Sequence, residues 1–297
     1  MNVFIFPGQG SQRRGMGKDL FDQVPEFTSV EKEIDAQLGY SVRALCLEDA
    51  SNQLSQTQYT QPCLYVVNAL HYYKAKAAGG RPAFLAGHSL GEYNALMAAG
   101  AFDFLTGLRL VQKRGELMAQ AKNGAMAAVI GLSPEAVIRL VAQNQLKAID
   151  IANYNSPTQI VLSGLESDIQ RVGPIMEKAG AKLYVPLPVS AAFHSRYMAA
   201  AAEAFDAFLG GFEFSTLTVP VVSNVTAQFY PTGSAALSIR SLLVKQIVRP
   251  VLWTQSIRFL LGKGVTTFSE TGPGEVLARL VQQTREAVPA PSPNRAA

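Results

Sequence analysis

Residues 87–91 read Gly-His-Ser-Leu-Gly and fit the pattern G-x-S-x-G, in which a serine stands between two glycines. An apolar run stops at Gly87 and a helical pattern begins after Gly91, so the pattern lies between a predicted strand and a predicted helix. In that context the turn holds the serine hydroxyl out of the sheet, and the helix points its amide groups at the atom under attack. This predicts that Ser89 is an acyl-transfer nucleophile rather than part of an ordinary glycine-serine turn.

A serine nucleophile needs a general base, and the chain contains three histidines. His194 stands where a predicted inserted unit returns to the main domain, so it can face the active site. His71 falls in a predicted helix beside two tyrosines and is interpreted as structural or solvated. His88 adjoins the nucleophile, where consecutive side chains diverge, and is expected to pack or bond locally. We therefore predict His194 as the base.

The acidic member of a Ser-His-acid triad is not evident. After His194, only Glu270 and Glu275 stand in a distinctive motif. A backbone carbonyl can hold the imidazole in place of a carboxylate, and the site would then be a Ser-His dyad.

Two further segments could stabilise or bind an acyl group. Gln9 lies between glycines after the first predicted strand, where backbone amides can approach an oxyanion. The elbow pattern places the other donor on Leu90, the residue after the nucleophile. A plain glycine turn explains the Gln9 segment equally well. Arg114 lies in a long predicted helix, where an inward guanidinium would need an anion, a carboxylate being the best match. Taken alone, a solvated helix face is the better interpretation of Arg114.

The elements that position these residues alternate along the outer parts of the chain. This alternation favours an α/β fold with a mostly parallel sheet and helices on both faces. We expect strands at 3–6, 84–86, 219–223 and 266–270, and helices at 60–77, 92–99, 104–121, 253–261 and 276–281.

The middle of the chain changes this rhythm to β-α-β-β-α-β, the order of a ferredoxin-like unit. We expect strands at 125–132, 148–152, 159–163 and 182–187, helices at 134–144 and 166–179, and a loop at 153–157. The predicted domains are a core at 1–124 and 194–286, a ferredoxin-like subdomain at 125–193 and a disordered tail at 287–297. A cleft between core and subdomain would be a natural active site.

The composition excludes several classes of protein. With 48% hydrophobic and 16% charged residues in 297, the chain is globular rather than disordered. A net charge of +4 without a long basic run argues against a nucleic-acid partner. Cys46 and Cys63 form no disulfide framework, and no apolar run reaches membrane-spanning length. The N-terminus lacks signal-peptide features, so we expect a cytoplasmic protein, in which the glycosylation sequon at Asn224 has no meaning.

Six segments together resemble the malonyl-CoA:acyl-carrier-protein transacylase family. In order and spacing they span the chain to about residue 285. They are FPGQGSQ at 6–12, TQP at 60–62, GHSLGEY at 87–93, QKRG at 112–115, AFHS at 192–195 and ETGPG at 270–274. The family fold, a hydrolase-like core with a ferredoxin-like insert, agrees with the pattern described above.

The resemblance implies a role for each matching position. Ser89 would carry the acyl group, and His194 would be the base, oriented by a main-chain carbonyl near residues 250–253. Arg114 would bind the malonyl carboxylate and Gln61 would line its pocket. The backbone amides of Gln9 and Leu90 would form the oxyanion hole.

The segment around His194 resembles one subgroup of this family, the acyltransferases of polyketide synthases. Phe193 precedes the histidine, as in malonyl-specific acyltransferases of polyketide synthases, and we expect it to crowd the carbon between the two carbonyls. Residues 151–157 and 189–195 look most like discrete acyltransferases that serve polyketide synthases in trans, of the disorazole synthase type. The implied partners are malonyl-CoA and the acyl carrier protein domains of a synthase, which carry the phosphopantetheine. No cofactor, metal or membrane partner is implied, and a monomer is expected.

Three alternatives remain at this point. A malonyl transacylase of fatty-acid synthesis shares the same motifs. An editing hydrolase that releases acyl groups from carrier proteins shares the fold and the elbow, although it gains nothing from a buried Arg114. A non-catalytic docking module of a synthase needs neither Ser89 nor His194.

Overall fold

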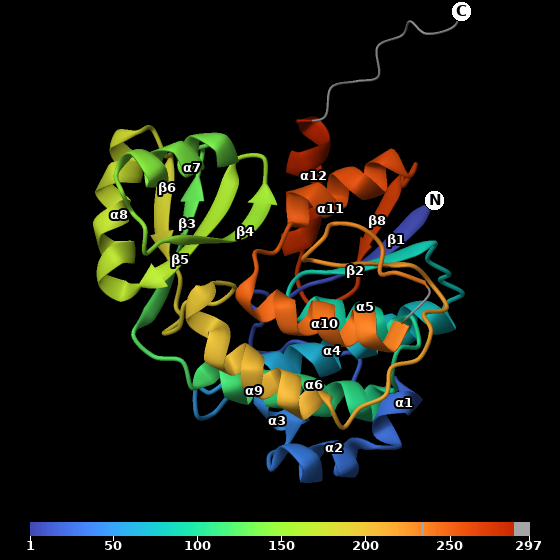
Figure 1. The fold of residues 1–297 in the computed structure, drawn as a ribbon. Helices are drawn as coiled ribbons and strands as arrows, with labels where there is room; N and C mark the ends of the chain where they lie inside the picture. The colour runs from blue at the N-terminus through green and yellow to red at the C-terminus, as the bar shows by residue number, and fades with distance from the viewer. Residues whose placement is uncertain (233–234, 288–297) are drawn as a thin grey trace, which may run out of the picture.

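The part of the chain that the computed structural model describes, residues 1–232 and 235–287, is built around two β-sheets (Figure 1). The first sheet is parallel, with strand order β7-β2-β1-β8. Its strands are β1 (Asn2–Phe6), β2 (Phe84–Gly87), β7 (Val221–Val222) and β8 (Thr267–Glu270). Because the strands run in one direction, the loops that follow them meet at one edge of the sheet.

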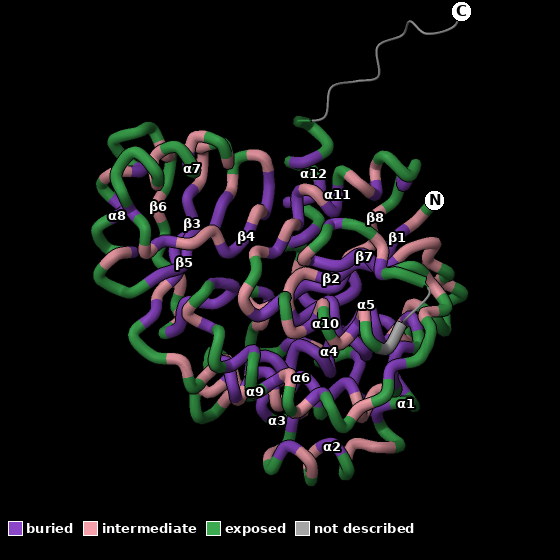
Figure 2. Tube along the Cα trace, in the orientation of Figure 1, coloured by how far each residue is buried: buried purple, intermediate pink, exposed green. Residues whose placement is uncertain are grey.

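Helices cover both faces of this sheet, and alternate side chains of β1 show the two layers. Phe4 and Phe6 pack into the larger apolar cluster with the helices at 57–77, 91–98 and 104–119, whereas Val3 and Ile5 pack into a second cluster with the helices at 253–262 and 276–286. Figure 2 shows β2 and β7 as mostly buried, as expected for strands covered on both sides. The helices of the core are α1 (Pro25–Thr28), α2 (Glu31–Leu38), α3 (Val42–Leu47), α4 (Thr57–Ala77), α5 (Gly91–Ala98), α6 (Phe104–Ala119), a 3₁₀ turn at Arg196–Met198, α9 (Ala199–Leu209), α10 (Ala235–Val248), α11 (Trp253–Gly262) and α12 (Val276–Glu286).

The second sheet is antiparallel, with strand order β4-β5-β3-β6, and has its own apolar cluster under two helices. Figure 1 shows this unit beside the core rather than stacked on it. Ser133 caps α7 by accepting from the amide of Ala136, with proline at the first helical position. The elements are β3 (Gly124–Ile130), α7 (Pro134–Gln143), β4 (Asp150–Ser156), β5 (Gln159–Leu165), α8 (Glu166–Lys178) and β6 (Leu183–Pro186).

The antiparallel unit is joined to the core by backbone hydrogen bonds as well as by chain connections. The amide of Val251 donates to the carbonyl of Ala152 at 2.8 Å, and the amide of Tyr154 donates to the carbonyl of Val251 at 2.9 Å. Residues just before α11 therefore lie along the edge of β4. This contact brings the last half of β4 toward the carboxyl edge of the parallel sheet.

The predicted fold class, a mostly parallel core with an inserted ferredoxin-like unit, is confirmed. The predicted loop at 153–157 is wrong, because β4 continues to Ser156 with two irregularities in its pairing to β5. The ranges assigned to core and insert remain a prediction, and the predicted disordered tail lies outside the described residues except for Ala287. No helix within the described residues is long and apolar enough to cross a membrane.

Candidate active site

Ser89 lies at the turn between β2 and α5 in a left-handed conformation, with φ of 50°. Both flanking glycines are required by close packing. A Cβ on Gly87 would lie 2.0 Å from the carbonyl carbon of Gly91, and a Cβ on Gly91 would lie 2.0 Å from the carbonyl oxygen of Phe6. The turn therefore has the compact geometry that the motif predicts, and it holds a non-glycine residue in a conformation that costs energy.

The hydroxyl of Ser89 lies 2.8 Å from Nε2 of His194, although the two residues are 105 positions apart in the sequence. The other ring nitrogen, Nδ1, donates to the backbone carbonyl of Gln246 at 2.8 Å. A carbonyl can only accept, so this bond places the proton on Nδ1 and leaves Nε2 free to take the serine proton. The structure thus brings the predicted nucleophile and base together.

The imidazole of His194 is neutral at physiological pH. Burial, followed by the positive charge of Arg114, lowers the pKa of His194 to about 3. A neutral ring is the form that accepts a proton from serine, so the base is available without prior deprotonation.

The group that orients His194 is a carbonyl, as expected from the missing acid, but its position differs from the expected one. It belongs to Gln246 in α10, before the stretch 250–253. Neither acidic candidate reaches the imidazole. The carboxylate of Glu270 accepts from the amides of Leu277 and Ala278 at the start of α12, and Glu275 is exposed.

Arg114 is 1% exposed, so the interpretation as a solvated helix face is wrong. Its Nη1 donates to Oε1 of Gln61 at 2.6 Å, and its Nη2 donates to Oε1 of Gln246 at 2.9 Å and to Oγ of Ser89 at 3.0 Å. The guanidinium also lies over the ring of Tyr93. The cation is therefore held beside the nucleophile by side chains from α4 and α10.

No carboxylate within the described residues forms a salt bridge with Arg114. Both amides that hold it are neutral, and burial lowers its pKa. A buried cation that no carboxylate contacts is costly, so this site favours an anionic ligand that would pair with it directly.

The two predicted oxyanion donors lie on adjacent loops. The amide of His88 donates to the carbonyl of Phe6 at 2.9 Å, and a Cβ on Gly8 would lie 2.4 Å from the carbonyl oxygen of His88. The loop after β1 is therefore packed on the elbow. Among the described residues the backbone amides of Gln9 and Leu90 donate to no other group. Their role as an oxyanion hole stays a prediction.

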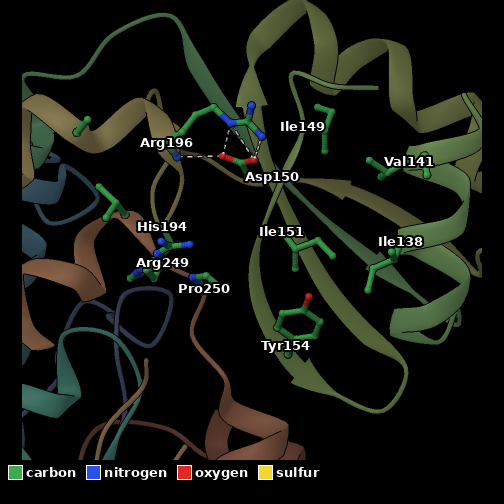
Figure 3. Close-up of a pocket in the computed structure, with 13 residues that line it drawn as sticks. Ile138, Val141, Ile149, Asp150, Ile151, Tyr154, His194, Arg196, Arg249 and Pro250 are labelled. Atoms are coloured by element: carbon green, nitrogen blue, oxygen red, sulfur yellow. Dashed lines mark hydrogen bonds and ion pairs between the residues drawn. The ribbon is translucent and has the colours of Figure 1, made fainter. Parts of the chain in front are cut away.

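Consecutive residues Phe193 and His194 line different cavities. His194 lines a cavity of about 740 Å³ between α7, β4 and the segment after α10, which Figure 3 shows with Ile138 and Tyr154 on its far side. Phe193 lines a cavity of about 480 Å³ that also includes Thr57. Thr57 accepts from the side chain of Gln9 at 3.2 Å, so the Phe193 cavity lies on the oxyanion-loop side of the site.

The other two histidines lie outside this constellation. Nε2 of His88 contacts Oδ1 of Asn155 in β4 at 2.8 Å, and its ring meets Trp253 edge to face. We expected His88 to pack or bond locally. Its ring packs against Trp253, but its hydrogen bond is made to the insert and not to a local group. His71 is half-buried, and burial, followed by Lys74, lowers its pKa to about 4.

Three buried polar residues around the elbow were not predicted: Glu92, Asn224 and Gln246. Asn224 accepts from the amide of Ser89 at 2.7 Å and donates to the carbonyl of Gly87 at 2.6 Å. The side chain of Asn224 is thus buried in the folded protein with both of its polar atoms bonded. Glu92 stands within the quoted motif, but Gln246 has no signal of its own in the sequence.

Comparison with known proteins agrees with this geometry. The family model described as "Acyl transferase domain" matches residues 3–295. The polyketide biosynthesis malonyl CoA-acyl carrier protein transacylase BaeC of Bacillus velezensis is 50% identical over 98% of this chain and 100% of its own length. The polyketide biosynthesis protein PksE of Bacillus subtilis is 49% identical over 96% of this chain, but the chain spans 36% of that protein. The crystal structure of a malonyl CoA-acyl carrier protein transacylase from Burkholderia pseudomallei covers 98% of this chain and 99% of its own, with a TM-score of 0.91 and 47% identity.

Proposed function

The chain belongs to the acyl transferase domain family, and from this premise we propose that it transfers a malonyl group from malonyl-CoA to the phosphopantetheine thiol of an acyl carrier protein. The observation that carries this proposal is the position of Arg114. Its Nη2 lies 3.0 Å from the nucleophilic oxygen of Ser89. In a malonyl thioester a single methylene separates the carboxylate from the carbonyl under attack, so the cation that binds the carboxylate must lie this close to the nucleophile.

The first half-reaction forms a malonyl-serine. Oγ of Ser89 attacks the thioester carbonyl while Nε2 of His194 takes its proton. The carbonyl oxygen becomes an oxyanion that the amides of Gln9 and Leu90 stabilise, each worth about 3 kcal/mol in comparable sites. The tetrahedral intermediate collapses with cleavage of the carbon–sulfur bond, and the proton on His194 passes to the leaving thiolate of CoA.

The second half-reaction reverses these roles. The thiol of the carrier's phosphopantetheine gives its proton to His194 as its sulfur attacks the malonyl ester. Collapse then returns the proton to Oγ of Ser89 and releases the malonyl-carrier. Throughout, Arg114 holds the carboxylate with the donors of its guanidinium, and Gln61 and Gln246 keep the guanidinium in place.

The pathway we propose is polyketide synthesis with the enzyme acting in trans. The named functions of BaeC and PksE support it, and the chain covers the whole length of BaeC. Service to fatty-acid synthesis is the alternative. The monomeric state and the cytoplasmic location stay predictions.

An editing hydrolase would use the same nucleophile and base but would release free acid. The test mixes the enzyme with malonyl-CoA in the presence and absence of a holo-carrier protein, and measures malonyl-carrier and free malonate by mass spectrometry. Transfer much faster than malonate release supports the transferase. Rapid malonate release without transfer would support the hydrolase, and a chain that neither transfers nor hydrolyses would be a docking module.

A further inference from the structure

Glu92 is the only Asp or Glu side chain among the described residues that is buried, and it has no exposed surface. It lies in the first turn of α5, directly below the elbow. The mechanism above gives it no role. A carboxylate is kept in such a place at a cost unless its oxygens are fully bonded.

Three donors meet this carboxylate. Oε1 accepts from the backbone amide of Asn224 at 3.2 Å and from the hydroxyl of Tyr230 at 2.6 Å. Oε2 accepts from Nε2 of Gln246. The three donors come from the loop after β7, from the segment that follows it, and from α10.

Two of these donor residues form hydrogen bonds with the backbone of the turn that holds the nucleophile. The side chain of Asn224 bonds the amide of Ser89 and the carbonyl of Gly87, on both sides of the turn. Nε2 of Gln246 also donates to the carbonyl of Ser89 at 2.9 Å, while its Oε1 accepts from Arg114. Rotating the Gln246 amide by half a turn would set its NH₂ against the guanidinium and its oxygen against two acceptors. Its orientation is therefore fixed by Glu92 on one side and Arg114 on the other.

We propose that Glu92 is a positioning residue for malonyl transfer, which fixes Asn224 and Gln246 and through them holds both Ser89 in its left-handed turn and Arg114 at its side. This inference rests on the proposed function. Its consequence is that Glu92 influences both the rate of acylation and the preference for a carboxylate-bearing acyl group, although it touches neither substrate nor base.

The ionised form of Glu92 is the one that can accept from all three donors. Burial raises its pKa to about 7, opposed by the bonds from Tyr230, Gln246 and Asn224 and by the charge of Arg114. At pH 8 the carboxylate is therefore the major form, and experiments at that pH examine the arrangement described here.

The test compares Glu92→Gln with the wild type at pH 8 in single turnovers with malonyl-CoA and with acetyl-CoA. A glutamine carries one oxygen and one NH₂, so it can serve Gln246 or the amide of Asn224 but not both. We expect malonyl-enzyme formation to slow by about 10- to 100-fold, the loss typical of one hydrogen bond to a charged group. Acetyl-enzyme formation should slow less, so the malonyl-to-acetyl ratio should fall. Glu203→Gln, at an exposed site of α9, is the matched control and should behave as wild type.

With acyl-CoA in excess over enzyme and no carrier protein present, the amplitude of acyl-enzyme formation gives the fraction of active enzyme, which separates positioning from mere destabilisation. A purely structural role would lower the amplitude and leave the rate constants and the acyl ratio unchanged, and that result would overturn the proposal. If Glu92→Gln does not fold, Tyr230→Phe removes one of the three donors and should shift rate and ratio in the same direction; unchanged values there would also overturn it. A wild type that forms no malonyl-enzyme would instead refute the proposed function.

Discussion

Around Ser89, the core supplies the hydroxyl, the imidazole, the guanidinium and the amides that hold them, whereas the insert reaches the elbow through the contact of Asn155 with His88. The two units also differ in how they are built. In the core, Ser89 and Asn224 follow the neighbouring parallel strands β2 and β7, and the helices α6 and α10 bring Arg114 and Gln246 to the same edge of the sheet. The insert has an apolar cluster of its own, but Met126, Ala128, Ala152 and Val161 pack into the larger cluster of the core, and backbone bonds at Val251 add to this attachment.

This difference indicates that the core carries the chemistry and that the insert forms a wall of the neighbouring cavity. A change in the core moves groups that touch the reacting atoms, so it should alter the chemistry. A change in the insert alters a wall of the cavity beside His194 or the attachment of that wall (Figure 3). We therefore expect core substitutions to affect rate and selectivity, and insert substitutions to affect mainly stability.

The largest effect should follow His194→Ala. Without the imidazole, no group accepts the proton of Ser89, and we expect transfer to fall by at least about a thousandfold. The pKa of about 3 predicts that His194 causes no loss of activity between pH 8 and pH 5. Single-turnover rates at pH 8 check the loss, and the rates of Glu92→Gln from pH 8 to pH 5 check the pH statement, because that variant lacks the carboxyl group of Glu92, whose pKa of about 7 lies in this range. An Asp or Glu substitution as harmful as His194→Ala, in a protein folded by circular dichroism, would contradict the dyad.

Arg114→Ala should change selectivity rather than abolish the nucleophile. Two charge-assisted bonds to the malonyl carboxylate are each worth about 1.5–3 kcal/mol, so the malonyl-to-acetyl ratio of kcat/KM should drop by about two to four orders of magnitude. Arg114→Lys should restore part of it, because an ammonium cannot reproduce the planar fork. An unchanged ratio would place malonyl selectivity elsewhere, for example at Phe193.

Asn155→Ala tests the insert where it touches the elbow. The substitution leaves Nε2 of His88 buried and unpaired, which should cost about 1–3 kcal/mol of folding stability in urea denaturation. We expect kcat to fall by less than about tenfold. A loss of kcat comparable with that of His194→Ala, at unchanged stability, would show that the insert takes part in the chemistry.

Asp150→Asn should have the smallest effect. Asp150 in β4 pairs with Arg196 in the core; the arginine side chain is 60% exposed and the aspartate side chain 19%, and the aspartate also accepts from the backbone amide of Arg196, a bond that asparagine can keep. Solvent screens such a pair, so we expect at most about 1 kcal/mol in stability and no change in kcat. Thermal unfolding at low and high salt checks this, and a large destabilisation would mean that the ion pair is a principal attachment of the insert.

Features that depend on residues close together in the sequence were predicted best. The elbow could be recognised because its glycines and serine are spaced by local geometry. The inward position of Arg114 has a signal in the sequence, because Arg114 continues the stripe of Leu110, Val111 and Met118 at helical spacing, but this stripe alone leaves a solvated helix face as the better interpretation. The end of β4 was missed because its polar residues resemble a loop, while pairing with β5 and contact with Val251 make it a strand.

Features that depend on contacts between distant segments could not be predicted from the sequence. The carbonyl that orients His194 has no side-chain signature, and α10, which carries it, was not predicted. Gln246 is an ordinary glutamine until the fold places its backbone against His194 and its amide against Arg114. The same holds for Asn224, whose role follows from its position after β7.

The central claim is that Ser89 carries the malonyl group, and it is tested most directly by locating that group. The enzyme is mixed with malonyl-CoA, quenched within one turnover, digested and mapped by peptide mass spectrometry, with Ser89→Ala in parallel. We expect the malonyl mass on the peptide containing Ser89 in the wild type and no covalent adduct in the variant. A malonyl group on any other residue of the wild type, or undiminished labelling of Ser89→Ala, would contradict it.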